Sequence, residues 1–130
     1  AFGVEDPSAL TANHRAFTIM VRNYMFRLVQ LFALEKEDRL AELLDYLDEV
    51  PDFGAILDDY FDEYDDIDSG PEARGPEFFR LGDTDSRAWS VRQIIKDPAG
   101  DHAYQFVATV DLDASDDAGE VRLSDLRVEY

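Results

Sequence analysis

The stretch WSVRQIIKDPAGDHAYQFVATVDL, residues 89–112, decides the fold of this chain. Its first part shows a period of two, the pattern of a strand with one buried face, at Trp89, Val91, Gln93 and Ile95. The same period returns at Tyr104, Phe106, Ala108, Val110 and Leu112. Between the two runs, DPAGD (residues 97–101) has turn chemistry, because proline fixes φ and glycine permits positive φ. The stretch predicts a long β-hairpin whose apolar face needs a partner, since a two-stranded ribbon alone is marginal.

The upstream half of the chain predicts the helices that supply this partner. Ser8 can cap a first helix of about six turns, whose apolar residues recur at helical spacing from Leu10 to Phe32. A second helix is predicted from Glu37 to Val50, and Pro51 ends it. Asp52 can cap a third helix that carries apolar residues from Phe53 to Tyr64.

Downstream, the pattern predicts a short strand at Glu77–Leu81, a turn at Gly82–Ser86 and a polar loop at Asp113–Gly119. In the last strand the apolar face switches from odd to even positions, which predicts a β-bulge near Ser124-Asp125. The predicted fold class is α+β: three N-terminal helices packed on a curved four-stranded antiparallel sheet. The nearest architecture is the nuclear transport factor 2-like, or cystatin-like, roll, an analogy that carries no function. We expect residues 1–7 to be a linker remnant and residues 8–130 to form a single α+β domain.

The charge of the chain is strongly acidic. It carries 30 Asp and Glu against 12 Lys and Arg, a net charge of −18, which repels phosphate at long range and disfavours broad electrostatic binding of nucleic acid. Fifteen of the acidic residues and only two basic ones lie between Glu35 and Asp68. Such an Asp-rich, Lys-poor composition is typical of a salty cytoplasm or of a biased genome. In contrast, residues 8–34 contain three arginines, Arg15, Arg22 and Arg27, and no acidic residue.

Several classes of protein are disfavoured by what the sequence does not contain. The chain has no cysteine, which excludes disulfides and thiolate metal sites, and no apolar run of about 18 residues that would span a membrane. We therefore expect a cytoplasmic protein with no membrane partner. The chain begins Ala-Phe-Gly without an initiator methionine, from which we expect a fragment or a processed product. It contains no G-x-x-x-x-G-K-[ST] motif and no D-E-A-D-like run, so we expect no ATP site here.

The candidate catalytic and metal-binding residues are few. His14 and His102 are the only histidines, and neither lies at the spacing of a metal motif, so we expect a structural role for each. The acidic run DASDDAG (residues 113–119) lacks the register and closing glutamate of a calcium loop. We expect no metal site and no catalytic residue. One alternative stays open: a pocket between the long helix and the sheet, lined by Tyr24, Trp89, Tyr104 and Asp111, where a carboxylate beside tyrosines would transfer protons. We favour the simpler reading, in which the aromatic residues fill the core.

Three stretches resemble one family: TANHRAFTIMVRNYMFR (residues 11–27), SGPEARGPEFFRL (69–81) and WSVRQIIKDPAGDHAYQFVATVDLDASDDAG (89–119). They are similar to a bacterial domain of unknown function that lies C-terminal to the ATPase core of DEAD/DEAH-box superfamily II helicases. The resemblance covers most of the chain and matches least well between Leu34 and Asp68. It implies a helicase context and no catalytic residue in this chain.

From this resemblance we expect a non-catalytic accessory domain of an ATP-dependent, RNA-directed helicase. It would dock on the motor core of the same polypeptide or on a partner and modulate the handling of nucleic acid. ATP and Mg²⁺ would bind only in the upstream core, and RNA would be contacted through the parent protein. Arg15, Arg22 and Arg27 are either a solvated helix flank, which we favour, or a docking face for RNA phosphate or the core. The alternative function is a free-standing small-molecule-binding roll with isomerase- or dehydratase-like proton transfer.

Overall fold

The computed structural model describes residues 8–85 and 87–130. Within them the chain forms an α+β fold with four α-helices and one open four-stranded antiparallel sheet of order β1-β2-β3-β4. The helices are α1 (His14–Ala33), α2 (Glu37–Leu43), α3 (Phe53–Glu63) and α4 (Leu112–Ala118). The strands are β1 (Phe79–Asp85), β2 (Ala88–Ile94), β3 (Gln105–Asp111) and β4 (Leu123–Glu129). The predicted linker, residues 1–7, lies outside the described residues.

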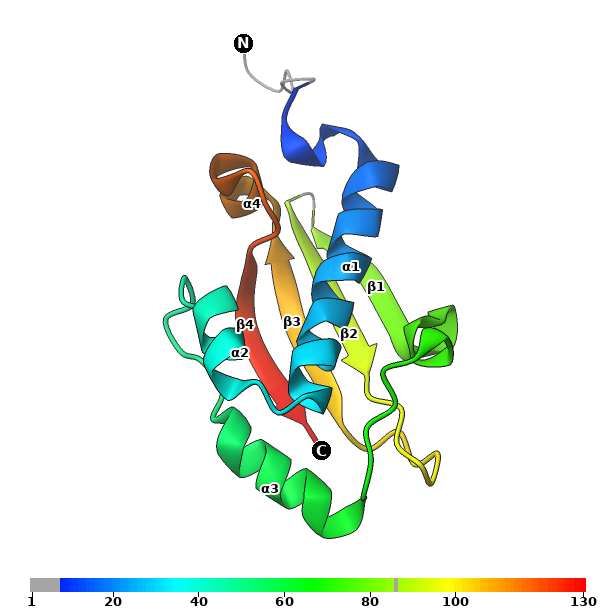
Figure 1. The fold of residues 1–130 in the computed structure, drawn as a ribbon. Coiled ribbons are helices and arrows are strands. Elements are labelled where there is room, and N and C mark those ends of the chain that lie inside the picture. Colours follow the sequence, from blue (N-terminus) through cyan, green and yellow to red (C-terminus); the bar gives the residue numbers. More distant parts are fainter. Residues whose placement is uncertain (1–7, 86) are drawn as a thin grey trace.

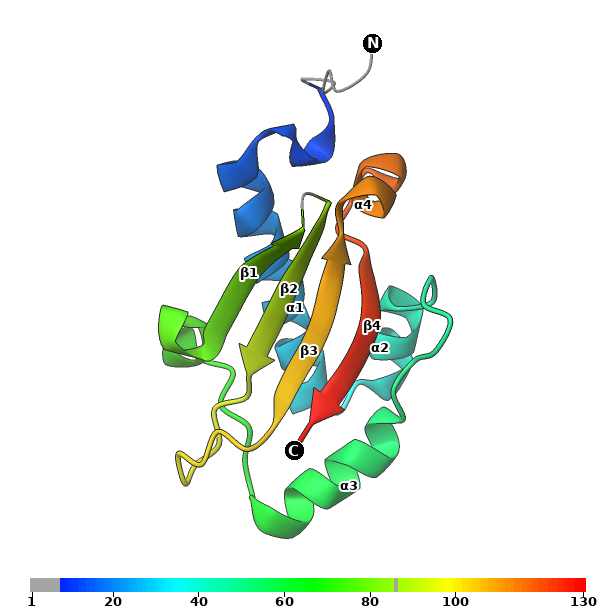
Figure 2. The same ribbon diagram turned by 180° about the vertical axis from the view of Figure 1, so that it is seen from behind.

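The sheet is covered by helices on one face only. Helix α1 lies across that face, with α2 and α3 toward the β4 side and the lower end of the molecule (Figure 1). Seen from behind, the four strands lie in front, and none of the described helices crosses them (Figure 2). The covered face and the helices enclose the core, because each strand presents alternate side chains to it. The opposite face remains free to contact other molecules.

The hairpin of β2 and β3 agrees with its predicted pattern. Trp89, Val91, Gln93 and Ile95 are all buried on the covered face, as are the even positions from Tyr104 to Leu112. The hairpin pattern predicts that Trp89 packs over the first helix, near Phe106 or Tyr104. The register instead pairs Trp89 with Val110, and its ring lies 5.3 Å from the ring of Phe17 on α1. The residue of β3 that lies opposite Trp89 depends on the register of the hairpin, which the alternation of residues alone does not fix.

The predicted bulge in the last strand is confirmed. Val107 pairs with Arg127 and Thr109 pairs with Ser124, so two residues of β4 stand opposite the single residue between Val107 and Thr109. Asp125 takes a positive φ of 52°, which absorbs the extra residue. As a result Leu123 and Leu126, which an unbroken strand would point to opposite faces, are both buried.

Two predicted helix boundaries are wrong. Ser8 does not cap α1; a short 3₁₀ turn at Leu10–Ala12 precedes it, and Asn13 is the cap, accepting from the N–H of Ala16 at 3.0 Å. Helix α2 ends at Leu43 rather than at Val50. The chain turns there because Leu44 is buried in the core and the Tyr46 hydroxyl reaches toward β4. The predicted cap of α3 is confirmed, since Asp52 accepts from the N–H of Ala55 at 3.1 Å.

The predicted loop at Asp113–Gly119 is also wrong, because residues 112–118 form α4. Asp111 caps this helix by accepting from the N–H of Ala114 at 3.0 Å, and Gly119 ends it with a positive φ of 72°. Ser115 is buried inside it, donating to the Asp111 carbonyl at 2.7 Å and accepting from the N–H of Arg122 at 2.9 Å. These hydrogen bonds stabilise α4, because an isolated helix of this length would not be stable in water.

The region before β2 also differs from the prediction. Glu77 and Phe78 belong to a 3₁₀ turn, and the strand that starts at Phe79 continues through the predicted turn to Asp85. Gly82 allows this continuation, because it pairs with Ser90 and a Cβ there would lie 2.8 Å from the Ser90 Oγ. Glycine normally indicates a turn, whereas here it permits the close approach of two strands.

Candidate interaction surfaces

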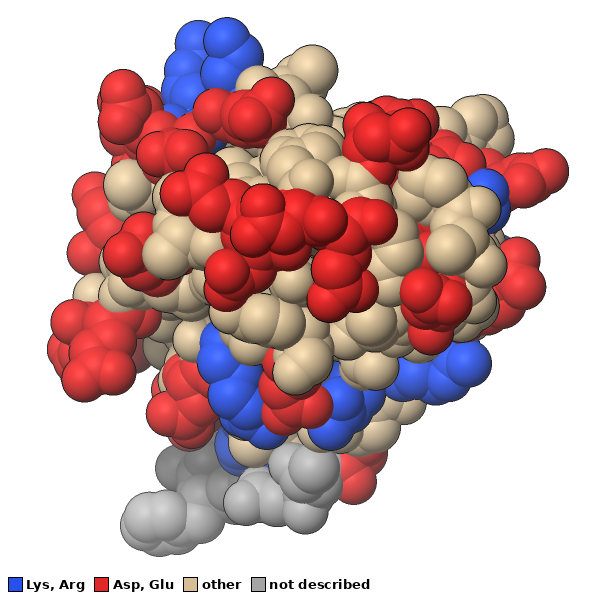
Figure 3. Space-filling model, turned by 90° about the horizontal axis from the view of Figure 1, so that it is seen from below, with Lys and Arg blue, Asp and Glu red and all other residues tan. Residues whose placement is uncertain are grey.

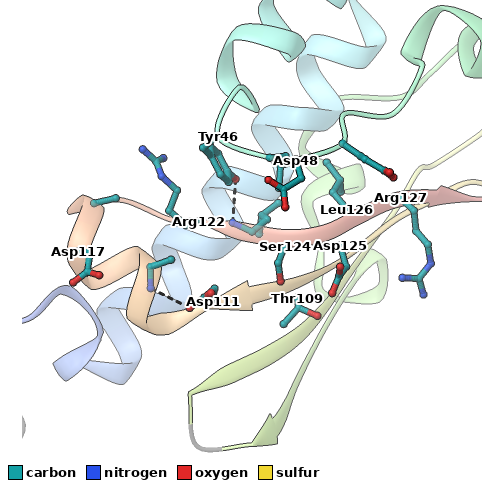
Figure 4. Close-up of a pocket in the computed structure, with 15 residues that line it drawn as sticks. Tyr46, Asp48, Thr109, Asp111, Asp117, Arg122, Ser124, Asp125, Leu126 and Arg127 are labelled. Atoms are coloured by element: carbon teal, nitrogen blue, oxygen red, sulfur yellow. Dashed lines mark hydrogen bonds between the residues drawn. The ribbon is translucent and has the colours of Figure 1, made fainter.

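A hollow of about 1160 Å³ lies beside the outer edge of β4. Its walls come from the turn after α2 and from three consecutive elements much later in the chain, β3, α4 and β4. Tyr46 and Asp48 lie on the turn after α2, Asp117 lies on α4, and Asp125 lies on β4 (Figure 4). The short α2 and the additional α4 therefore shape this site, which explains why sequence analysis did not predict it.

The Tyr46 side chain is held in place by three neighbours, two at its hydroxyl and one at its ring. It accepts the backbone N–H of Leu123 at 3.0 Å, and its oxygen lies 2.8 Å from the hydroxyl of Tyr24, where either group can donate. The guanidinium of Arg122 lies 4.4 Å from the centre of the Tyr46 ring, within the range of a cation–π contact. The wall of the hollow at Tyr46 is thus a built arrangement that joins α1, the α2 turn and β4.

The two tyrosines remain protonated near neutral pH. Burial is the largest cause that raises the pKa of Tyr24, and the hydrogen bond with Tyr46 adds to it. Burial likewise raises the pKa of Tyr46. Neither phenol is poised to accept a proton, which disfavours general-base chemistry here.

The charge of this hollow is negative. Five acidic residues line it, Asp48, Glu49, Asp111, Asp117 and Asp125, against two basic ones, Arg122 and Arg127. Arg122 already pairs with Glu120 at 2.7 Å, which reduces its effect on an approaching ligand. No histidine occurs among the lining residues that could activate Ser124 or Thr109. The arrangement suits the binding of a basic group better than it suits catalysis.

A second surface is the uncovered face of the sheet, which carries a row of arginines. The register places Arg80 opposite Arg92, Arg92 opposite Val107, and Val107 opposite Arg127. These four residues cross all four strands on one face, and strands spaced roughly 4.8 Å apart make the row about 14 Å long. Val107 is only 7% exposed although no helix covers it. Its burial fits with the long stems of the arginine side chains lying over it. We call this set the arginine row.

A second row runs beside it and consists of small or hydroxyl-bearing residues. Gly82 pairs with Ser90, Ser90 with Thr109, and Thr109 with Ser124. A hollow of about 440 Å³ lies over this floor and is bordered by the arginine row. We call the second set the hydroxyl row.

One carboxylate compensates part of this positive charge. Glu129 accepts from Arg92 at 3.0 Å through one oxygen and from Arg127 at 2.8 Å through the other. Contact with Arg92, then with Arg127, lowers the pKa of Glu129, so it stays ionised at neutral pH. Arg80 instead donates to the carbonyls of Pro76 and Glu77, each at 2.9 Å. The three arginines of the row outnumber Glu129, the one carboxylate that contacts them, so the row is positive in a chain whose net charge is −18.

The two kinds of charge are distributed unevenly. Viewed from below, acidic side chains dominate the end of the molecule where α3 lies, whereas most of the basic side chains in view form a band toward the lower border, with acidic ones between them (Figure 3). In that orientation the uncovered face of the sheet lies along the same border. The acidic end and the band of basic side chains are therefore different surfaces of the molecule.

Comparison with known families assigns the chain to one of them. The model of a domain of unknown function, DUF3516, matches residues 2–128 of the 130. The chain belongs to the DUF3516 family. No curated protein and no solved structure matches it significantly. The family description gives no activity, so any function must be argued from the surfaces described above.

The four residues of the alternative pocket do not come together. Trp89 is buried against His14 and Phe17, with ring centres at 4.9 and 5.3 Å. Tyr104 is buried at the other end of the hairpin, where its ring lies 5.0 Å from that of Tyr60. The hydroxyl of Tyr24 forms a hydrogen bond with the hydroxyl of Tyr46, whereas Asp111 caps α4 and lines the acidic hollow. Only Asp111 of the four therefore faces a described hollow, and its carboxylate is engaged in capping.

The three arginines of α1 do not share one face. Arg15 and Arg27 are exposed, whereas Arg22 is half-buried, donating to the Arg74 carbonyl at 3.4 Å with its guanidinium 5.1 Å from the Phe79 ring. Helical spacing of 100° per residue places Arg27 roughly 140° around the axis from Arg22. A flat ligand would contact Arg15 and Arg22 without reaching Arg27.

The remaining candidates have structural contacts. His102 lies in the hairpin loop with its ring 5.0 Å from Phe78, and its N–H donates to buried Asp97 at 2.8 Å. Asp116 of the acidic run accepts from Arg87 at 2.7 Å and from Thr11. Among residues 8–85 and 87–130, no group of three or more histidine or acidic side chains is arranged to hold a metal ion. Likewise, none of the described helices combines the length and apolar character needed to cross a lipid bilayer.

Sequence analysis did not single out Arg80, Arg92 or Arg127, yet one signal was available. Arg92 alternates with Val91 and Gln93 in the predicted strand, and Arg127 lies between Leu126 and Val128, which the shifted phase points inward. Both therefore point away from the core by periodicity alone. That they stand in one row required the register of three strand pairs.

Proposed function

We propose that this domain is a non-catalytic accessory module of an ATP-dependent DEAD/DEAH-box RNA helicase, docking on the motor core and modulating nucleic-acid handling. The helicase context rests on the family resemblance of the three stretches. The observation that carries the docking role is the acidic hollow beside β4, whose five carboxylates outnumber its two arginines. In this proposal ATP and Mg²⁺ bind to the motor core, the compartment is the cytoplasm, and RNA is contacted by the whole protein.

The chemistry of the hollow selects a basic partner. Motor domains that grip nucleic acid need positively charged surfaces to neutralise phosphate, so basic segments are present on them. A segment rich in Lys and Arg would find Asp48, Glu49 and Asp125 within one hollow, with Leu47 and Leu126 supplying apolar contact. Electrostatic complementarity of this kind chiefly sets association rate and orientation.

The test is binding between the domain and the motor core encoded upstream of it. Calorimetry with the separated parts should show an interaction that weakens at least tenfold when Asp48→Asn, Glu49→Gln and Asp125→Asn are combined. The matched control changes three exposed carboxylates away from the hollow, Asp58→Asn, Asp62→Asn and Asp65→Asn, and should bind like the parent. An upstream reading frame without ATPase motifs would refute the helicase context. Equal weakening by both triple variants would refute docking through the hollow.

The finer fold assignment belongs to the same proposal. We assign the architecture to the nuclear transport factor 2-like, or cystatin-like, roll, with α1, α2 and α3 as its N-terminal helices. Support comes from the long α1 lying across one face of a bulged four-strand meander. An experimental structure in which the sheet does not curve around α1 would contradict it. The alternative of a proton-transferring roll is not carried forward, because Tyr24, Trp89, Tyr104 and Asp111 lie apart.

A further inference from the structure

We propose that the arginine row and the hydroxyl row together bind the phosphate group of a compact phosphorylated ligand on the uncovered face of the sheet. This site shares Thr109 and Arg127 with the wall of the acidic hollow, but it lies on the uncovered face of the sheet and does not depend on the docking role. It would give the domain a ligand of its own, recognised by charge and by hydrogen bonds to oxygen.

The floor of the site is shaped for close approach. Gly82, Ser90 and Thr109 lie side by side across three strands beneath a hollow of about 440 Å³. A Cβ at position 82 would meet the Ser90 Oγ at 2.8 Å, so glycine leaves this hydroxyl the space that it occupies. The Ser90 hydroxyl lies 3.3 Å from the Gly82 carbonyl, a long hydrogen bond that an oxyanion can replace. Small residues thus leave room for a phosphate group where larger ones would fill it.

The walls supply charged donors that the protein does not fully use. Arg92 engages one terminal nitrogen, Nη1, with Gln105 and Glu129, and within the described part of the chain its Nε and Nη2 have no partner. Arg127 contacts Glu129 through Nε and Nη2, and its Nη1 likewise has no partner among the described residues. Arg80 engages only Nη1, with backbone carbonyls. Guanidinium groups are the preferred partners of phosphate, because their planar forks donate two parallel hydrogen bonds.

Glu129 acts as an internal counter-charge for this site. It bridges Arg92 and Arg127 and so holds both side chains over the sheet before any ligand arrives. A phosphate dianion brings more negative charge than the single carboxylate that already contacts these arginines. Removing the charge of Glu129 should therefore strengthen anion binding, an effect opposite to that expected if Glu129 were itself part of a cation site.

A compact ligand fits the surroundings better than nucleic acid does. The row is about 14 Å long, and a strand of nucleic acid would extend past it onto a surface that gives the chain its net charge of −18. The residues of the two rows also include no aromatic side chain on which bases would stack, the usual contact of single-strand binders. A phosphate on a small molecule can contact the arginine row without extending past it.

The experiment is a titration of the ¹⁵N-labelled domain followed by its amide and arginine side-chain signals. The probes are inorganic phosphate, ribose 5-phosphate and a ten-residue oligothymidylate. We expect saturable shifts confined to the two rows with inorganic phosphate and ribose 5-phosphate. Tighter binding of the sugar phosphate would identify an esterified ligand, and equal binding would identify the free anion. Both results support the site.

The variants sharpen this test. Arg92→Gln and Arg127→Gln should each weaken binding at least tenfold, and Glu129→Gln should tighten it several-fold. Arg39→Gln is the matched control, because Arg39 is an exposed arginine of α2 and its loss changes the net charge equally. The proposal would be overturned if the shifts did not saturate or if the oligonucleotide bound more tightly than the two small probes. It would also be overturned if Arg39→Gln weakened phosphate binding as much as the row variants do, or if Glu129→Gln left phosphate binding unchanged. The spectra themselves report whether each variant is folded.

Discussion

The hydroxyl of Tyr46 accepts the backbone N–H of Leu123 at 3.0 Å. This one hydrogen bond joins the turn after α2 to the first residue of β4, 77 residues later in the chain. It closes one wall of the acidic hollow and satisfies a backbone donor at the edge of the sheet. An unpaired donor there would be costly in the folded state and open to pairing with another chain.

Tyr46→Phe should destabilise the domain by about 1–3 kcal/mol, since it leaves the Leu123 N–H without its acceptor. Denaturant unfolding of the variant and the parent measures this difference. Tyr130→Phe is the control: it also deletes a phenol hydroxyl with one partner, Asp59 at 2.7 Å, but at an exposed site. Similar losses of unfolding free energy in the two variants would show that the hydrogen bond between Leu123 and Tyr46 stabilises the fold no more than an exposed one does.

Trp89→Ala should be among the most destabilising single changes. The side chain is 4% exposed and packs between β2 and α1 against Phe17 and His14. Truncating an aromatic residue in a core typically costs about 3–5 kcal/mol, a large part of a small domain's stability of about 5–15 kcal/mol. Asp117→Ala, at an exposed site on α4, should change stability by no more than about 0.5 kcal/mol. A variant lacking Trp89 that melts like the parent would contradict the packing described.

The tyrosines predict an unusual alkaline titration. The pKa of each is raised in the folded chain: Tyr24, Tyr46, Tyr60, Tyr64, Tyr104 and Tyr130. Burial is the largest cause for Tyr104 and raises its pKa to about 12, whereas a hydrogen bond to Asp101 is the largest cause for Tyr64. In the unfolded chain the same phenols ionise near pH 10.

Because the folded state holds these protons more tightly, the stabilisation is complete below about pH 10 and is lost as pH rises through the folded values. Phenolate absorbance of the native domain should therefore rise at higher pH than that of the denatured domain, whose six phenols ionise near pH 10. The denaturant concentration at the midpoint of unfolding should fall as the pH is raised above about 10. A native titration curve that coincides with the curve of the denatured chain would contradict this assignment.

The isolated domain should bind nucleic acid weakly or not at all at physiological salt, since its charge of −18 repels phosphate. Any residual contact is expected to be local, through Arg15 and Arg22 on one side of α1 or through Arg27 on another. Fluorescence anisotropy with a labelled single strand in 0.15 M salt measures the affinity. Tight binding that persists when all three arginines are changed to alanine would refute both statements.

Much of the sheet was predictable because its signals are local. The alternation of residues 89–95 and 104–112 and the phase change in the last strand identified three strands, the hairpin and the bulge, all of which the structure contains. The errors fall where tertiary contacts decide. Helix α2 ends early because Leu44 is buried and the Tyr46 hydroxyl contacts β4. The acidic sequence of α4 predicted a loop, but the buried Ser115 stabilises a helix of seven residues there.

The sequence by itself determined the fold class, the strongly acidic charge and the inward faces of β2, β3 and β4, because periodicity and composition are properties of neighbouring residues. It also contained the outward direction of Arg92 and Arg127. Only the tertiary structure decided that Arg80, Arg92 and Arg127 stand in one row and that Tyr46 reaches Leu123 across 77 residues. Strand register and chain reversal bring these groups together, and both depend on how the whole core packs rather than on any local pattern.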